Sequence, residues 1–125
     1  MLGTVLLADD DENVRVLARR VLGHLGYDMV GVEDATAAVA LYRQAIECGK
    51  PFSAVILDLW MPGGIPSSNA LSTMRGLNPQ ICAFVMSGDE DNPCMQHPSE
   101  HGYLGAISKT CLHETLSKTL REHLP

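Results

Sequence analysis

The chain has 125 residues, of which 46% are hydrophobic and 19% charged, and its formal net charge is -6. This length and composition suit one domain with a single core and argue against intrinsic disorder. The acidic balance, with no basic cluster beyond the pair Arg19 and Arg20, argues against direct contact with nucleic acid. Because no apolar run is long enough for a membrane span or a signal peptide, we expect a cytoplasmic segment without membrane contact.

Short apolar runs alternate with helical patterns along the first half of the chain. The order is strand, helix, strand, helix, and then a third strand that is apolar nearly throughout, as a strand covered by helices on both faces is. Asp11 and Asp34 are the predicted N-caps of the two helices, and Gly26 is a natural stop for the first. The predicted strands are 4–8, 27–32 and 52–57, and the predicted helices are 11–25, with an apolar face of Val14, Leu17, Ala18, Val21, Leu22 and Leu25, and 34–46.

The second half continues the alternation less regularly. A short helix precedes a fourth strand that ends at Ser87. The polar segment 89–102 contains Pro93 and Pro98, so any helix there is expected to be short or irregular. A weak fifth strand ends at Lys109, and leucines at a spacing of four predict a last helix. The predicted elements are helix 69–77, strand 81–86, strand 104–108 and a helix that carries Leu112, Leu116, Leu120 and Leu124.

Five alternations of strand and helix predict an α/β fold with a parallel sheet, right-handed crossovers and helices on both faces. Ligands of such folds bind beyond the carboxyl ends of the strands. An unpaired charge at the end of a buried strand is costly unless the strand emerges into a site, so the polar residues at these ends are candidate site residues. In chain order they are Asp9, Asp10, Asp58, Ser87 and Lys109.

The chemistry of these side chains suits phosphoryl transfer. Crowded carboxylates repel one another, and a hard divalent cation relieves the repulsion. Oxygen ligands suit Mg2+, which keeps waters and shares its coordination sphere with a phosphate. Lys109 adds a mobile positive charge, and Ser87 adds a hydroxyl donor. Together these groups could support transfer of a phosphoryl group onto Asp58 by positioning and charge neutralisation.

At these residues the chain resembles the receiver domains of two-component response regulators. The similar stretches, "VLLADDDENVR", "GYDMVGVEDA", "AVILDLWMPGG", "FVMSGDE" and "GAISKT", occur in order over about the whole chain. The resemblance implies a flavodoxin-like (βα)5 doubly wound parallel sheet with strand order 2-1-3-4-5, formed by a single domain over 1–125. The stretches "LWMPGG" and "HGYLGAISK" are most similar to receivers attached to hybrid sensor histidine kinases.

The resemblance also implies a role for each site residue and a partner. The partner is a histidine kinase or phosphotransfer domain, whose phosphohistidine supplies the phosphoryl group, and a kinase or output domain linked in the same polypeptide is a further one. A receiver catalyses its own phosphotransfer and dephosphorylation, so it is not expected to be an enzyme in the usual sense. Asp58 is the implied phosphoacceptor. The implied Mg2+ ligands are Asp9, Asp10 and Asp58 with the Trp60 backbone carbonyl. Ser87 is the implied switch hydroxyl, and Lys109 is the implied site lysine.

Two positions depart from the family's usual pattern. The aromatic residue three before the lysine, which usually rotates with the switch hydroxyl, is Ala106 here, and Tyr103 comes three residues too early. The proline that usually follows the lysine, often after a cis bond, is Thr110, and a Lys-Thr bond is expected to be trans. We therefore expect the site chemistry to survive and the relay to weaken, so that phosphorylation perturbs the loops after the third and fourth strands more than residues 103–120.

Two other functions fit parts of this pattern. A degenerate receiver that acts as a phosphorylation-independent interaction module would account for Ala106, Thr110 and the irregular segment 89–102. An independent Mg2+-dependent aspartyl-phosphate phosphatase is disfavoured, because the chain has no room for a cap domain or an added base. Trp60 is either a packed aromatic residue or a shield over Asp58. The histidines are interpreted as surface residues: His24, His97, His101, His113 and His123.

Overall fold

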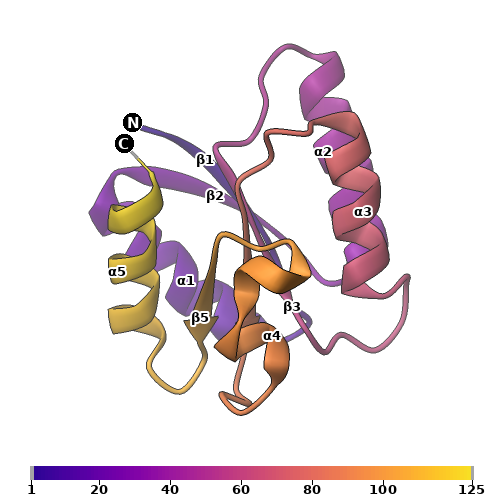
Figure 1. Cartoon of the computed structure of the whole chain (residues 1–125). Helices are drawn as coiled ribbons and strands as arrows, with labels where there is room; N and C mark the ends of the chain where they lie inside the picture. The colour runs from indigo at the N-terminus through magenta and orange to yellow at the C-terminus, as the bar shows by residue number, and fades with distance from the viewer. Residues whose placement is uncertain (1, 125) are drawn as a thin grey trace.

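The predicted alternation of strands and helices is present in the computed structural model, which describes residues 2–124 (Figure 1). Most of the elements start or end within two residues of the predicted bounds. In chain order they are β1 (Gly3–Ala8), α1 (Glu12–Leu25), β2 (Tyr27–Val32), α2 (Ala35–Glu47), β3 (Ala54–Asp58), α3 (Ser67–Leu77), β4 (Ala83–Ser87), α4 (Pro93–Gln96), the 3-10 helix η1 (Pro98–His101), β5 (Gly105–Ser108) and α5 (Leu112–His123).

The strands form one parallel sheet in the order β2-β1-β3-β4-β5, which confirms the predicted flavodoxin-like doubly wound fold. In the register, Ala8 of β1 lies opposite Leu57 of β3, and Ser87 of β4 lies opposite Ser108 of β5. From β1 the chain first adds β2 on one side and then β3, β4 and β5 on the other, so the direction of winding reverses between β1 and β3. The carboxyl ends of β1, β3, β4 and β5 meet at one edge on either side of this point.

The core has two layers because successive strand residues point to opposite faces of the sheet. Leu7 and Ile56 pack against α1 and α5, whereas Leu6 and Leu57 pack against α2 and α3. Figure 1 shows the two helix layers, with α1 and α5 on one side of the sheet and α2 and α3 on the other. All four side chains are fully buried, and each such burial contributes about 1.5–3 kcal/mol. Both faces of β1 and β3 are thus covered by helices.

Local signals place the first two helices as predicted. The Asp11 carboxylate accepts the N–H of Asn13 at 2.9 Å, and Asp34 accepts the N–H of Ala37 at 2.7 Å. Gly26 adopts the left-handed conformation with φ 93°, and its N–H bonds to the carbonyls of the last helical turn. The caps at Asp11 and Asp34 both lie at the sheet edge where the site residues gather.

Three details differ from the sequence predictions. The sequence predicts Leu17 on the buried face of α1, but it is 40% exposed because α1 buries a narrower stripe centred on Ala18, Val21 and Leu22. Strand β3 begins two residues later than predicted and includes Asp58, since Leu59 continues its pairing with β4. Helix α3 begins two residues earlier, at Ser67.

The helices are short, and the segment 89–102 is the least regular part of the chain. α4 has 4 residues and η1 has 4, so the helices there are short, as the sequence predicted, and each begins with a proline. α1, with 14 residues, is the longest helix. Within the described residues, no helix combines the length and the apolar character needed to cross a bilayer.

Candidate functional site

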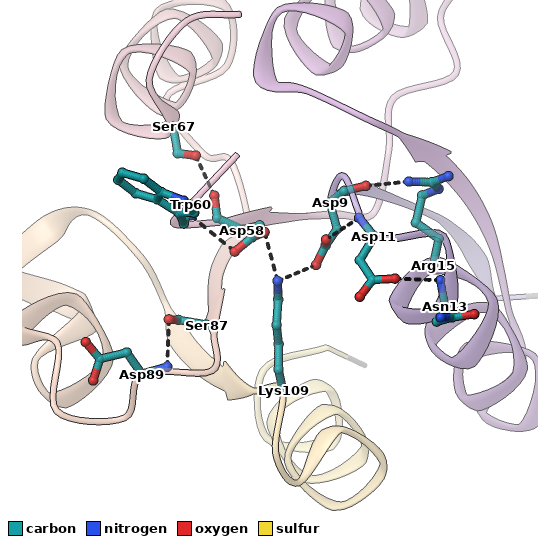
Figure 2. Close-up of polar contacts among 10 residues, drawn as sticks. All are labelled: Asp9, Asp11, Asn13, Arg15, Asp58, Trp60, Ser67, Ser87, Asp89 and Lys109. Carbon is teal, nitrogen blue, oxygen red and sulfur yellow. Dashed lines mark hydrogen bonds and ion pairs between the residues drawn. The ribbon is translucent and has the colours of Figure 1, made fainter. Parts of the chain in front are cut away.

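Three strand ends bring Asp9, Asp58 and Lys109 into direct contact. Asp9 follows β1, Asp58 is the last residue of β3, and Lys109 follows β5. The Lys109 Nζ lies 2.8 Å from Asp58 Oδ2 and 2.9 Å from Asp9 Oδ2. Figure 2 shows the lysine side chain reaching up between the two carboxylates. The predicted convergence of these three residues is thus present, across a separation of 51 residues between Asp58 and Lys109.

The two carboxylates are buried, and each has an oxygen in contact with the Lys109 ammonium. Asp9 is fully buried and Asp58 is 2% exposed. Asp9 Oδ1 accepts the N–H of Asp11 at 2.9 Å. Asp9 Oδ2 lies 2.9 Å from Lys109 Nζ, and no other described residue bonds to it. A buried carboxylate oxygen whose only described partner is a cation is suited to further positive charge.

Burial and charge shift the pKa values of this group in the same direction for different reasons. Burial raises the pKa of Asp58, and it outweighs the opposing hydrogen bond from Lys109. The nearby charge of Asp9 raises the Asp58 pKa further. Burial lowers the pKa of Lys109, but its contacts with Asp58 and Asp9 outweigh that effect, so the net pKa is raised. Lys109 is therefore charged at neutral pH, and it is the group that offsets the repulsion between the carboxylates.

The backbone beneath each carboxylate is fixed by a side chain that the sequence analysis missed. Arg15 donates to the carbonyl of Asp9 at 2.7 Å, and the Ser67 hydroxyl donates to the carbonyl of Asp58. The N–H of Trp60 also donates to Asp58 Oδ1 at 3.2 Å. Figure 2 shows these contacts converging on the ends of β1 and β3. No local sequence pattern predicts these roles of Arg15 and Ser67, because each side chain bonds to a backbone carbonyl whose position depends on a loop.

Trp60 and Ser87 lie beside the site rather than in its centre. The Trp60 side chain is not packed, since the residue is 82% exposed, and Figure 2 places its ring at the rim next to Asp58. The Ser87 hydroxyl accepts the N–H of Asp89 at 3.0 Å. Its own proton has no partner among the described residues, and no hydrogen bond joins it to Asp58 or Lys109 there. Ser87 is thus close to the site with a free donor, and its role as switch hydroxyl stays a prediction.

The two departures from the family's pattern are visible in the structure. Ala106 is half-buried in β5 and packs on the layer that contains α3 and α4. The peptide bond before Thr110 is trans, as predicted, because the described chain contains no cis peptide bond. The expectation that the histidines are surface residues is also confirmed, since these are all exposed: His24, His97, His101, His113 and His123.

The acidic cluster fits a divalent cation. Asp9, Asp10 and Asp58 each offer a carboxylate oxygen, and the three atoms lie within 4.8 Å of one another. Asp10 is exposed, so the cluster opens to solvent on its side. Carboxylate oxygens are the ligands that hard cations such as Mg2+ and Ca2+ prefer. The Trp60 carbonyl stays a predicted further ligand.

Comparisons with known proteins agree with this geometry. The model of the response regulator receiver domain family matches residues 5–121. Among solved structures, chemotaxis protein CheY4 of Vibrio cholerae covers 99% of this chain and 100% of its own, with a TM-score of 0.82 and 23% identity. A response regulator receiver domain protein of Clostridium thermocellum covers 97% and 93%, with a TM-score of 0.81 and 17% identity. These two likenesses concern the fold.

Curated relatives are longer than this chain. The transcriptional regulatory protein AruR of Pseudomonas aeruginosa is 36% identical over 63 residues, which are 50% of this chain and 26% of AruR. A putative NtrX-like response regulator of Rickettsia typhi is 32% identical over 85 residues, which are 67% of this chain and 17% of that protein. The chain thus spans about a quarter or less of these relatives. With the family match over 5–121, the sheet order and the acidic pocket beside Lys109, the chain belongs to the response regulator receiver domain family of two-component signalling.

Proposed function

We propose that this receiver accepts a phosphoryl group on Asp58 from a phosphohistidine of a histidine kinase or phosphotransfer domain. One observation carries the proposal. Asp58 ends a buried central strand, and its Oδ2 lies 2.8 Å from Lys109 Nζ, within a cluster of carboxylates. An acceptor needs a carboxylate held in a fixed orientation beside positive charge, and the contacts with Lys109 and with the N–H of Trp60 provide both.

The proposed phosphoryl transfer is a displacement reaction at phosphorus. A carboxylate oxygen of Asp58 forms the new P–O bond while the P–N bond to the donor imidazole breaks, and the imidazole leaves with its electron pair. The product is an acyl phosphate. Lys109 carries three N–H donors, so it can keep its contact with Asp9 and turn another donor to a phosphoryl oxygen. The N–H of Trp60 keeps Asp58 Oδ1 in place through the 3.2 Å bond.

Mg2+ is the cation proposed for the acidic cluster. Asp9, Asp10 and Asp58 would hold it, with the Trp60 carbonyl as a further ligand. The supporting observation is that the three residues each offer a carboxylate oxygen and that these atoms lie within 4.8 Å of one another. When bound, Mg2+ supplies positive charge to the phosphoryl oxygens and lowers the repulsion they meet. Lys109 and Mg2+ together would balance the charge of the three carboxylates.

The setting of this receiver in a longer protein is also a proposal. The stretches "LWMPGG" and "HGYLGAISK" support attachment to a hybrid sensor histidine kinase, as in the receivers they resemble. The curated relatives are instead a transcriptional regulatory protein and putative response regulators, so an output domain is the other attachment proposed. In both settings the receiver works in the cytoplasm, and it catalyses only its own phosphorylation and dephosphorylation.

A small phosphodonor tests the proposal without a known kinase. Phosphoramidate with Mg2+ should add one phosphoryl group to the wild type, detected by intact mass, and the yield should fall sharply in a chelator. Asp58→Asn should abolish the adduct, whereas Asp28→Asn, a matched change at an exposed position of β2, should not. An adduct of equal yield on Asp58→Asn would disprove the assignment. No adduct on the wild type would favour the alternative, a phosphorylation-independent interaction module.

A further inference from the structure

A second polar group includes the two residues that flank Lys109 in the sequence. It joins the residues on either side of the lysine to the loop after β4. The Ser108 hydroxyl donates to Glu90 Oε1 at 2.6 Å. The Thr110 hydroxyl lies 2.8 Å from Ser108 Oγ and 3.4 Å from the same oxygen of Glu90. We call Glu90, Ser108 and Thr110 the lysine clasp.

The protons of the lysine clasp can be assigned from its distances. Ser108 has one hydroxyl proton, and the short contact to a carboxylate oxygen uses it. Thr110 is then the donor in its contact with Ser108, which leaves a chain from Thr110 to Ser108 to the Glu90 carboxylate. Hydrogen bonds to an ionised acceptor are about twice as strong as neutral ones. Ser108 is 5% exposed, so this bond also satisfies a buried hydroxyl.

The backbone around Lys109 is held from two further directions. The N–H of Lys109 donates to the carbonyl of Ser87 at 2.9 Å, which continues the pairing of β4 and β5. The Thr115 hydroxyl accepts the N–H of Ser108 at 3.0 Å and lies 2.8 Å from the carbonyl of Cys111, to which it donates. The loop thus has contacts with β4 and α5, and Glu90 provides its contact with the loop after β4.

Residue 110 is a threonine, so no proline ring fixes the backbone φ angle there. The peptide bond before it is trans. Lys109 also carries a long side chain, whose fixation costs up to about 2 kcal/mol of rotamer entropy. Its Nζ must nevertheless meet two carboxylates at 2.8 and 2.9 Å. We propose that Glu90, acting through Ser108 and Thr110, is a positioning residue for Lys109 in the phosphorylation of Asp58. This inference rests on the proposed function.

Removal of Glu90 should therefore slow the reaction through Lys109 and by no other route. We expect Glu90→Ala to lower the rate of Asp58 phosphorylation by phosphoramidate about tenfold, the low end of what supporting residues of a polar site contribute. In a Lys109→Ala background, followed over longer times, Glu90→Ala should slow the reaction no further. Glu90→Gln keeps an acceptor oxygen and should lie between wild type and Glu90→Ala. Glu47→Ala, an exposed change at the end of α2, should match the wild type.

Amide hydrogen exchange gives a readout that needs no phosphorylation. We expect the amide of Lys109 to exchange about tenfold faster in Glu90→Ala than in wild type, with β1 and β3 unchanged. Thr110→Val, a mild change at an exposed position, should give a smaller effect of the same kind and covers the case in which Glu90→Ala folds poorly.

The outcomes separate this inference from the proposed function. If the wild type gains no phosphoryl group on Asp58, the proposed function fails, and so does the part of the inference that concerns the reaction. If the wild type is phosphorylated but Glu90→Ala reacts at the same rate, only the lysine clasp is refuted. Equal slowing in the Lys109 and Lys109→Ala backgrounds would also overturn it, since Glu90 would then act without the lysine.

Discussion

Replacement of Lys109 by methionine should destabilise the fold strongly in the absence of a divalent cation. Methionine preserves much of the length and volume of the lysine stem and removes the charge together with the N–H donors. The ammonium lies 2.8 Å from Asp58 and 2.9 Å from Asp9, and both aspartates are buried. Its loss therefore leaves two buried like charges beside each other with no counter-ion from the chain.

The size of the effect follows from the contacts that are lost. Two unit charges at contact attract by about 4 kcal/mol at an effective dielectric constant of about 20, and burial of the charges takes back much of this gain. When one partner of a buried pair is removed, the remaining charge is uncompensated and the loss is about 3–5 kcal/mol. Because the Lys109 side chain is 24% exposed, we expect a value near about 3 kcal/mol.

The sign of the pH dependence is also fixed. The pKa of Asp58 is already raised, mainly by burial, and Lys109 is the strongest group that lowers it. In Lys109→Met the pKa of Asp58 rises further. At a pH between its pKa in the unfolded chain and its pKa in the folded state, Asp58 is protonated in the folded state and ionised in the unfolded chain. Stability present at low pH is then lost as pH rises through this window. The deficit of the variant should shrink on acidification.

Urea denaturation in chelator and in excess Mg2+ measures the effect. The variant should lose about 3 kcal/mol in chelator and recover a large part in Mg2+, since a cation that binds only the folded state stabilises it. Lys118→Met is the control, because Lys118 is 78% exposed and 4.0 Å from its partner Glu122, and such pairs contribute less than about 1 kcal/mol. A loss below about 1 kcal/mol, or one insensitive to Mg2+, would refute the buried-pair reasoning.

Three further predictions concern other positions. Asp10→Asn should reduce the rise in melting temperature that Mg2+ produces, and an unchanged rise would show that Asp10 is not a ligand. Gly26→Ala should lower the free energy of unfolding by about 1 kcal/mol because φ at Gly26 is 93°. Gly23→Ala, inside α1 with open space around it, should raise it by about 0.5–1 kcal/mol. Urea denaturation measures both changes, and changes of the same sign would contradict this reasoning. Burial raises the pKa of Tyr103 to about 12, so stability should fall as pH rises from about 10 to about 12, and Tyr103→Phe should remove that fall in denaturation series.

The fold could be predicted because its signals are local. Apolar runs, the caps at Asp11 and Asp34 and the stop at Gly26 each act within a few residues, and the structure uses all of them. Details that depend on tertiary pairing could not be read from the chain. Asp58 belongs to β3 because Leu59 pairs with Met86 of β4, and Leu17 is exposed because of how α1 sits on the sheet.

The centre of the site was predictable for a related reason, and its surroundings were not. Parallel strands that end in polar residues must present them at one edge, which brings Asp9, Asp58 and Lys109 together. Arg15 and Glu90 support these residues from loops and a helix, and their partners lie 6 and 18 residues away in the sequence. Such contacts depend on loop conformations that no periodicity encodes.

We expect Ala106 to limit how far a phosphoryl signal travels. A methyl group has no rotamer to change, so it cannot follow Ser87 if that hydroxyl moves toward a phosphoryl oxygen. A ligand shifts a structure only through its different interactions with two states, and here the loop after β4 is joined to residues 108–110 by Glu90 rather than by a ring. The sequence alone predicts weak effects over 103–120. With the Glu90 contacts, we expect beryllofluoride, a phosphoryl mimic, to move backbone NMR shifts in 59–68, 87–92 and also 108–110. Helix α5 should change little, and shifts there as large as those at Ser87 would mean that another relay exists, with Tyr103 the first residue to test.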